Sequence, residues 1–264
     1  MEISIITVNF NDAVGLESTV RSVISQKSDK YEYIVIDGGS TDGSVEVIKK
    51  YTDKIDYWIS ERDRGIYHAM NKGVAQAHGD YCLFLNSGDS FYDDSVLNHI
   101  QELGCNVDII VGKVVSKNGH SQLFLPPTRE ISLYYLYSGT VPHQGAFIRT
   151  DLLRRIPYDE NLKIVSDWKF FLEAIVLNNC TVRYVDEYIA EFDTTGVSTS
   201  NPEIMWKEKE LVLIELFPPR VLADYQQMKA SECLTQKLMP QLRQHYTIDK
   251  IIYRISRLLL KFVK

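Results

Sequence analysis

A run of apolar residues at positions 81–85 ends in four residues that suit the binding of a polar ligand. The run is long enough for one buried strand, and Asn86, Ser87, Gly88 and Asp89 follow it. In open α/β sheets, ligands bind beyond the carboxyl ends of the strands. Gly88 permits close approach of the backbone, and Asp89 offers a carboxylate oxygen of the kind that hard cations prefer. An ordinary polar turn would use the same residues, so the interpretation depends on the other strand ends.

Two earlier predicted strands end in similar polar loops. The strand 3–8 is followed by Asn9, and the strand 33–36 is followed by the loop 37–44, which contains three glycines. Three glycines in so short a loop indicate unusual backbone angles or close approach of a ligand. Polar strand ends at three points therefore favour one shared binding crevice.

The first half of the chain alternates between strands and helices. Predicted strands at 3–8, 33–36, 55–60 and from 81 onward are separated by helical patterns, the first of which Asn11 or Asp12 can cap. This alternation predicts a largely parallel sheet with helices on both faces. A glycine-rich dinucleotide fingerprint is absent after the first strand, as is a P-loop, so neither chemistry is supported.

The regular alternation of strands and helices ends after Asp93, which we expect to cap a helix reaching Leu103. The Asn-Gly pair at 118–119 predicts a hairpin between the strands 107–115 and 121–125. Further short strands are expected at 145–148, 181–185 and 188–192, and Ser166 is the expected cap of another helix. We expect these antiparallel additions to form the second wall of a cleft.

The C-terminal part is expected to be helical from Pro202, with breaks at Pro218–Pro219 and at Pro240. In its last segment, 247–264, apolar residues fall on one helical face and basic residues on the other. A basic amphipathic helix of this kind binds anionic membrane surfaces. The alternative is a terminal helix docked on the core with a solvated basic face.

Composition excludes several classes of protein. The net charge of −6 argues against nucleic acid as a partner. The four cysteines are widely separated, and Cys82 lies within a strand pattern, which indicates a reducing compartment without a disulfide framework. We expect neither a signal peptide before the strand at 3–8 nor a membrane-spanning segment.

Taken in order, the motifs resemble those of the family-2 inverting glycosyltransferases with the GT-A fold, of the bacterial cell-envelope polysaccharide type. The residues that carry the resemblance lie at 5–9, 37–43, 63–67, 71–73, 84–89, 166–168 and 196–199. The resemblance implies an α/β fold, with a Rossmann-like mixed sheet flanked by helices and a helical C-terminal extension. It implies a glycosyltransferase domain at 1–200, with a nucleotide-sugar half (1–105) and an acceptor half (106–200), before the helical region 201–264.

The resemblance also implies a donor site. Thr7, Val8 and Asn9 would line a slot for the base, and Asp37 would accept from the uracil N–H. Asp63 would contact the nucleoside or its pyrophosphate surroundings. The nucleotide-sugar site as a whole would comprise Thr7, Val8, Asn9, Asp37, Gly38, Asp63, Gly65, Asn71, Asn86, Ser87 and Gly88. Asp37 could instead be a turn residue, and Asp63 could form an exposed ion pair with Arg62 or Arg64.

The expected chemistry needs a cation and a base. The family's usual D-x-D acids are replaced here by Asn86 and Gly88, so Asp89 is the expected protein ligand of Mg²⁺ or Mn²⁺. Asp167 matches the family's catalytic base, although an acid in the first turn of a helix often serves only the helix dipole.

Three further residues are assigned more weakly to the acceptor or phosphate side. These are His143, Trp168 and Ser198, the last within a loop, 193–199, that resembles a flap over the donor phosphates. His143 could equally be structural, and Trp168 could equally pack in the core.

The resemblance implies transfer of a sugar, with inversion, from a nucleotide-sugar donor to a lipid-linked glycan acceptor. The donor would be a UDP-hexose or UDP-N-acetylhexosamine, and the enzyme would lie in the cytoplasm at the inner face of the cell membrane. Lipopolysaccharide O-antigen or capsule synthesis is the natural setting. The alternatives are a catalytically degenerate nucleotide-sugar-binding partner of a synthesis complex and a nucleotidyltransferase.

Overall fold

The computed structural model describes residues 1–104, 106–117, 130–192, 201–243 and 255, with side chains from position 232 to 243 left aside. Two compact units are present, Met1–Glu210 and Leu211–Lys264. The first unit contains the sheet and all the site residues considered below.

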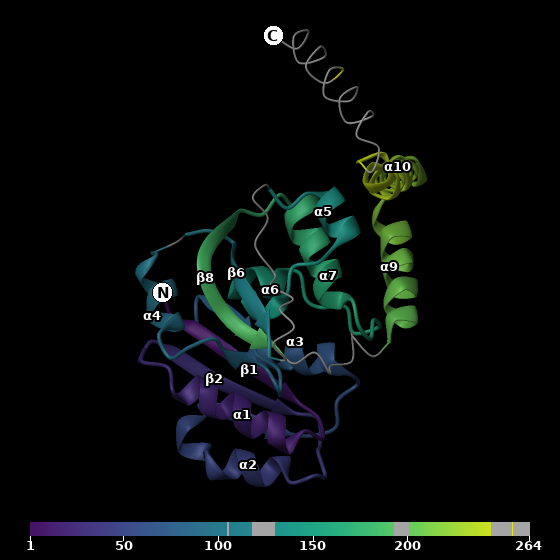
Figure 1. The fold of residues 1–264 in the computed structure, drawn as a ribbon. Coiled ribbons are helices and arrows are strands. Elements are labelled where there is room, and N and C mark those ends of the chain that lie inside the picture. Colours follow the sequence, from purple (N-terminus) through teal and green to yellow (C-terminus); the bar gives the residue numbers. More distant parts are fainter. Residues whose placement is uncertain (105, 118–129, 193–200, 244–254, 256–264) are drawn as a thin grey trace. The chain divides into compact units, whose positions relative to one another are not determined.

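The described residues of the first unit form one eight-stranded mixed sheet (Figure 1). Its strand order is β3-β2-β1-β4-β7-β6-β8-β5. The strands are β1 (Ile3–Asn9), β2 (Tyr31–Asp37), β3 (Tyr57–Ser60), β4 (Tyr81–Phe84), β5 (Ser90–Phe91), β6 (Ile109–Ser116), β7 (Ala146–Arg149) and β8 (Val182–Phe192). The first four strands pair in parallel, as the alternation of strands and helices predicts.

The second half of the sheet differs in part from the expectation. β7 lies antiparallel between β4 and β6, but β6 and β8 are parallel. The two strands expected at 181–185 and 188–192 are one continuous strand, β8. Its register against β6 shifts around Gly112, where an added Cβ would lie 2.3 Å from Ile189 Cγ1. The extra residues lie in β8, between the partners of Val111 and Lys113 and between those of Lys113 and Val114, so a bulge in β8 replaces the break expected at 186–187. The expected hairpin through 118–119 lies outside the described residues.

Helices cover both faces of the sheet, with α1 and α2 on one side and α3 on the other (Figure 1). The α-helices of the first unit are α1 (Ala13–Ile24), α2 (Ser44–Lys50), α3 (Ile66–Gln76), α4 (Val96–Glu102), α5 (Leu133–Ser138), α6 (Thr150–Arg155) and α7 (Ser166–Phe171). Short 3₁₀ turns lie at η1 (Thr52–Lys54) and η2 (His143–Gly145), and a π-helical turn, η3 (Leu172–Leu177), continues α7.

One predicted helix cap is confirmed and two are wrong. Asp12 caps α1, and its carboxylate accepts from the Gly15 N–H at 2.9 Å. The N-cap position of α4 is Ser95, and Asp93 instead accepts from the N–H and hydroxyl of Ser95. Ser166 is the first residue of α7 rather than its cap, because Val165 takes the cap position.

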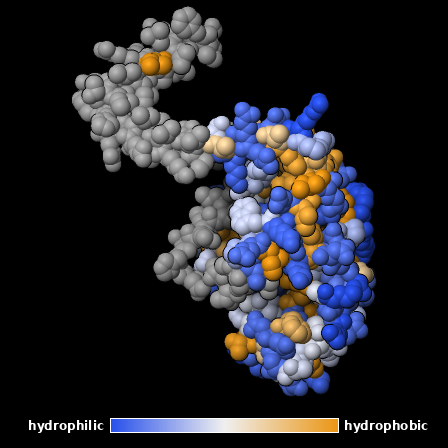
Figure 2. Space-filling view, turned by 90° about the vertical axis from the view of Figure 1, so that its right-hand side faces the viewer, coloured by the Kyte–Doolittle hydropathy of each residue, from blue (hydrophilic) through white to orange (hydrophobic). Residues whose placement is uncertain are grey.

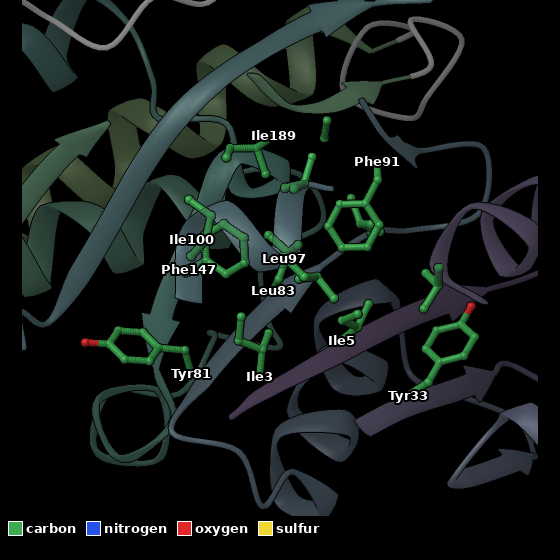
Figure 3. Close-up of a cluster of buried hydrophobic side chains, with 14 of the residues drawn as sticks. Ile3, Ile5, Tyr33, Tyr81, Leu83, Phe91, Leu97, Ile100, Phe147 and Ile189 are labelled. Atoms are coloured by element: carbon green, nitrogen blue, oxygen red, sulfur yellow. The ribbon is translucent and has the colours of Figure 1, made fainter. Parts of the chain in front are cut away.

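The core packs between the sheet and its helices. Figure 3 shows its central side chains, among them Ile3 and Ile5 of β1, Leu83 of β4, and Phe147 of β7. On the opposite face, α3 approaches β1 so closely that a Cβ on Gly73 would lie 2.5 Å from Ile6 Cγ2. This close packing sets the position of the loop that precedes α3.

Two long helices end the described part of the chain. They are α9 (Pro202–Leu216) and α10 (Pro219–Arg243). The break at Pro218–Pro219 is confirmed, but the break expected at Pro240 is wrong, since α10 continues to Arg243. Except for position 255, the expected amphipathic segment 247–264 lies outside the described residues. No helix in the described portion of the chain is long and apolar enough to cross a membrane.

Candidate active site

The carboxyl ends of β1 and β2 meet in a buried polar cluster. Asn9 is 1% exposed, and its Nδ2 donates to Asp37 Oδ1 at 2.6 Å. Its Oδ1 accepts from the hydroxyl of Ser87 at 2.7 Å. Asn9 therefore links two of the polar strand ends that the sequence predicts to converge.

Asp37 is fully buried, and its carboxylate accepts hydrogen bonds from several neighbouring protein groups. Its carboxylate accepts from Asn9 Nδ2, from the hydroxyls of Ser40 and Ser60, and from the N–H groups of Gly39 and Ser40. Although burial opposes ionisation, these hydrogen bonds hold the pKa of Asp37 below its usual value. This geometry matches the turn-residue alternative, and a contact with a base would require one of these hydrogen bonds to be exchanged.

Thr7 and Val8 lie beneath the expected base slot rather than on its surface. Thr7 is fully buried, and its hydroxyl lies 3.0 Å from the Tyr33 hydroxyl. Val8 is 8% exposed. A direct contact of Thr7 with a base is therefore not supported, because β1 turns this side chain into the core.

An exposed aromatic ring and an unpartnered carboxylate oxygen lie beside Gly38. Phe10 is 66% exposed, and a Cβ on Gly38 would lie 3.1 Å from its ring and 3.5 Å from Asp63 Oδ2. That oxygen is buried without a hydrogen-bond partner. Asp63 Oδ1 contacts Lys72 Nζ at 2.6 Å and His68 Nδ1 at 2.9 Å, which differs from the alternative of an exposed ion pair with Arg62 or Arg64. An orphaned buried acceptor requires a partner, which a ligand N–H or O–H could provide.

Gly65 and Asn71 have different surroundings. Gly65, at φ +142°, precedes α3, and a Cβ added to it would meet no atom within 4 Å. The side chain of Asn71 donates to the carbonyl of Tyr158 and accepts from the Tyr158 N–H. Asn71 thus fixes the segment before α7, and both ends of its amide are already in use.

Hydrogen bonds to Thr19 of α1 hold the turn 86–89 in place. Gly88 has a φ of +94°, a conformation that favours glycine. The buried Thr19 hydroxyl donates to the Asp89 carbonyl at 2.6 Å and accepts from the Gly88 N–H at 3.1 Å. Directly after β6, Lys117 Nζ donates to the Gly88 carbonyl at 2.5 Å. These contacts fix the turn in the position that the strand end predicts.

A chain of hydrogen bonds joins this turn to Asp167. His143 Nδ1 lies 3.1 Å from Asp167 Oδ2, and its Nε2 lies 3.3 Å from Asn86 Nδ2. The other oxygen of Asp167 lies 3.0 Å from the Tyr67 hydroxyl. Since an ionised carboxylate only accepts, His143 Nδ1 carries the proton. His143 thus connects the donor-side turn with the expected base.

The charges of this chain reinforce one another. Burial alone would raise the pKa of Asp167, but the hydrogen bond and charge of His143 hold it below the ordinary value of 3.8. Burial alone would lower the pKa of His143, but Asp167, with the charge of Asp89, raises it above 6.5. Asp167 is therefore ionised at neutral pH, as a general base must be.

Asp89 is 4% exposed, and Gln144 Nε2 donates to its Oδ2 at 3.2 Å. On the same turn, Asn86 Oδ1 is buried without a partner. Within the described ranges, no three His, Cys, Asp or Glu residues form a metal-binding group. One carboxylate and a nearby free oxygen fit a cation that takes its remaining ligands from a bound diphosphate and water.

The three weaker assignments, His143, Trp168 and Ser198, have different outcomes. His143 lies in the site, as described. Trp168 is 2% exposed, and its Nε1 donates to the Leu136 carbonyl, so the core-packing alternative holds and a stacking contact with an acceptor is not supported. Ser198 and the loop 193–199 lie outside the described residues.

Sequence reasoning missed several residues that shape this site. Phe10, Thr19, Lys117 and Gln144 were not assigned to it. An aromatic residue within the polar loop directly after a strand could have indicated Phe10. Thr19 lies at a core position of a helix, where a hydroxyl needs a partner, but the sequence does not show that this partner is the turn at 88–89.

Comparison with known proteins gives a family-level match. The model of the family described as "Glycosyl transferase family 2" matches residues 4–161. An uncharacterized glycosyltransferase of Mycobacterium tuberculosis is 36% identical over 211 residues, covering 75% of this chain and 77% of the relative. A PGL/p-HBAD biosynthesis glycosyltransferase of Mycobacterium bovis is 26% identical over 200 residues, covering 73% and 77%.

Solved structures match in fold. Residues 1–349 of S. aureus TarS in complex with UDP-GlcNAc give a TM-score of 0.66 at 21% identity, over 81% of this chain and 66% of that chain. The mannosyltransferase PcManGT of Pyrobaculum calidifontis, in complex with GDP-Man and Mn²⁺, gives 0.55 at 17% identity, over 71% and 56%. This chain thus spans just under two thirds of the TarS fragment. The mixed sheet with its flanking helices is the GT-A fold.

Proposed function

The chain belongs to glycosyl transferase family 2, and we propose from this that it transfers a sugar, with inversion, from a UDP-sugar to a lipid-linked glycan. The observation that carries the proposal is the chain of contacts from Asn86 through His143 to Asp167. It joins a carboxylate suited to general-base catalysis to the turn where donors bind in this fold.

The donor's base would stack on Phe10, next to the loop that follows β2. Phe10 is 66% exposed and offers a ring face to a ligand, while the ring lies so close to Gly38 that a Cβ there would be 3.1 Å away. The unpartnered Asp63 Oδ2 would accept from the uracil N–H or a ribose hydroxyl. Asp37 would then act by holding the loop, as its internal hydrogen bonds suggest.

The transfer step follows from the position of Asp167. The acceptor hydroxyl oxygen attacks the anomeric carbon from the face opposite the diphosphate, which inverts that centre. The bond between this carbon and the phosphate oxygen breaks, and UDP leaves with the electron pair. Asp167 takes the proton of the hydroxyl. General-base catalysis of this kind contributes roughly 10²–10⁴-fold.

Asp89 would hold a divalent cation, Mg²⁺ or Mn²⁺, which when bound supplies positive charge against the leaving diphosphate. Mn²⁺ accompanies GDP-Man in the PcManGT complex. Lys117 lies near the same turn and would add positive charge beside the diphosphate.

The proposed setting is cell-envelope polysaccharide synthesis at the inner face of the cell membrane. One relative is named as a PGL/p-HBAD biosynthesis glycosyltransferase, and the TarS fragment forms a complex with UDP-GlcNAc. A UDP-hexose or UDP-N-acetylhexosamine is therefore the proposed donor. The segment 247–264 would hold the enzyme at the membrane surface, near a lipid-linked acceptor.

The first test measures ligand-induced stabilisation and donor turnover. We expect UDP or one UDP-sugar, with Mn²⁺, to raise the melting temperature, since a ligand at 100 times its Kd adds about 2.7 kcal/mol. We also expect slow release of UDP from the preferred donor, with water as acceptor. Asp89→Asn should reduce the metal-dependent part of the shift, and Asp167→Asn should bind the donor yet release UDP roughly 10²–10⁴-fold more slowly.

Other outcomes separate the alternatives. Stabilisation by UDP-sugars without UDP release, with or without an acceptor extract, would indicate a catalytically degenerate binding partner, which the replacement of the D-x-D acids by Asn86 and Gly88 favours. Equal stabilisation by nucleoside triphosphates, with pyrophosphate release, would indicate a nucleotidyltransferase. No stabilisation by any nucleotide would exclude the proposed activity.

A further inference from the structure

We propose that Glu208 and Lys209 of α9 are positioning residues for Asp167. This inference rests on the proposed function, because it assigns a role in the same reaction. Both residues lie beyond the region that the family model matches, which ends at residue 161. Together they hold the two chain segments that flank the expected base.

Glu208 holds the segment before Asp167. Its side chain is 9% exposed, its Oε1 accepts from the Lys163 N–H at 2.8 Å, and its Oε2 accepts from the Ile164 N–H at 2.9 Å. Hydrogen bonds from N–H groups to a carboxylate are about twice as strong as neutral ones. Two parallel bonds to consecutive amides fix both the position and the orientation of the segment. A buried carboxylate is costly unless it is paired in this way.

Lys209 holds the segment after Asp167. Its Nζ lies 4.7 Å from the centre of the Trp168 ring and 3.3 Å from the Gly139 carbonyl. The Trp168 ring is buried, and its Nε1 donates to the Leu136 carbonyl at 2.8 Å. A cation over the face of an indole ring is attracted to the ring's π electrons. Lys209 therefore fixes the residue that directly follows Asp167.

The Glu208 contact continues to the carboxylate through Tyr67. The Tyr67 hydroxyl lies 2.6 Å from the Ile164 carbonyl and 3.0 Å from Asp167 Oδ1. Its single proton is shared between these two acceptors. If Ile164 moved, Tyr67 would donate to Asp167 alone and occupy an oxygen that must stay ready to take a proton. By fixing Ile164, Glu208 keeps the Tyr67 proton engaged elsewhere.

The side of the molecule that carries α9 is accessible to substitution and offers matched controls. The face seen in Figure 2 exposes a mixture of hydrophobic and hydrophilic residues. On α9, Trp206 is 53% exposed. Glu210 and Lys207 lie on the same helix and are exposed. Glu210→Gln and Lys207→Met therefore repeat the chemistry of Glu208→Gln and Lys209→Met without touching the segments around Asp167.

The experiment compares UDP release from the preferred UDP-sugar across these variants of the full chain. We expect Glu208→Gln to lower kcat about 10- to 100-fold and Lys209→Met about 3- to 10-fold. The Kd for UDP should change less than twofold, because no donor-site residue is altered. Glu210→Gln and Lys207→Met should retain the wild-type kcat. Glu208→Asp, which keeps the charge, should recover part of the loss.

A double variant separates positioning from general stabilisation. If Glu208 acts through Asp167, the residual rate of Asp167→Asn should not fall further when Glu208→Gln is added. Multiplicative losses in the double variant, or an unchanged kcat in Glu208→Gln, would overturn this inference while leaving the proposed function intact. A wild-type protein that binds no nucleotide would instead remove the proposed function itself, and this inference with it.

Discussion

At the scale of single residues, the pairing of His143 with Asp167 is the most consequential contact in the site. Their side chains are 17% and 18% exposed, and their ring nitrogen and carboxylate oxygen lie 3.1 Å apart. A pair this enclosed is screened less by water than a surface ion pair. It also joins residues 106–200 to residues 1–105, because His143 Nε2 lies against Asn86.

The signs of the two pKa shifts predict how this pair affects stability. The folded-state pKa of His143 is raised, so its contribution is fully present below 6.5 and is lost as the pH rises through the raised value. The pKa of Asp167 is lowered, so its contribution is present above 3.8 and is lost as the pH falls through the lowered value. Both contributions are present between these two ordinary values.

His143→Gln should therefore destabilise the protein most near pH 5.5, by about 2 kcal/mol, and distinctly less near pH 9. Urea unfolding at the two pH values measures the difference. His99→Gln is the control, since His99 is 49% exposed and its substitution should change stability by less than about 0.5 kcal/mol. An equal loss for His143→Gln at both pH values would show that the two groups do not form an ion pair.

At the scale of elements, the close approach of α3 to β1 determines the position of the loop that contains Asp63. Gly73 lies where any larger residue meets Ile6, and the loop with Asp63 leads directly into this helix. Gly73→Ala should destabilise the protein by about 1–3 kcal/mol through overpacking. This outcome opposes helix propensity, which favours alanine over glycine by about 1 kcal/mol.

Denaturant unfolding of the variant provides the measurement, and Ile6→Ala provides the test of cause. In the Ile6→Ala background the colliding Cγ2 is absent, so Gly73→Ala should cost little or become stabilising. If Gly73→Ala is equally costly in both backgrounds, the contact with Ile6 is not the reason.

Elements were predictable where one local pattern determined them. Apolar runs followed by polar residues defined β1, β2 and β4, and Asp12 identified the start of α1. The parallel pairing of β6 with β8 was not predictable, because it joins segments some seventy residues apart and depends on extra residues in β8 that shift the register opposite Gly112. Cap positions moved by one or two residues where Ser95 and Val165 competed with the expected caps.

The candidate site was likewise predictable only in part. Positions at strand ends, such as Asn86 and Asp89, follow from the sheet. Burial decided the rest, and the sequence does not display it. Asp37 is enclosed by its own loop, while Asp63 retains an unpartnered oxygen. The role of Glu208 depends on a contact 44 residues along the chain, in a region without a recognisable motif.

At the scale of the whole molecule, the distribution of charge matters more than its sum. The chain carries a net charge of −6, which by itself opposes contact with an anionic membrane. Its last fifteen residues contain five basic residues and no acidic one. Each basic residue near an anionic surface contributes about 1 kcal/mol. The proposed membrane contact therefore depends on this segment rather than on the average charge.

Two triple variants with the same change in net charge test this dependence. The first variant replaces three basic residues of the terminal segment, Arg254, Arg257 and Lys261, by glutamine. The second replaces three exposed lysines of the first unit, Lys27, Lys50 and Lys54, by glutamine. Co-sedimentation with phosphatidylglycerol-containing vesicles should fall more than tenfold in affinity for the terminal variant and change little for the other. High salt should weaken wild-type binding, and pure phosphatidylcholine vesicles should bind poorly. Equal binding by the two variants would mean that net charge, not an amphipathic terminal helix, governs the interaction.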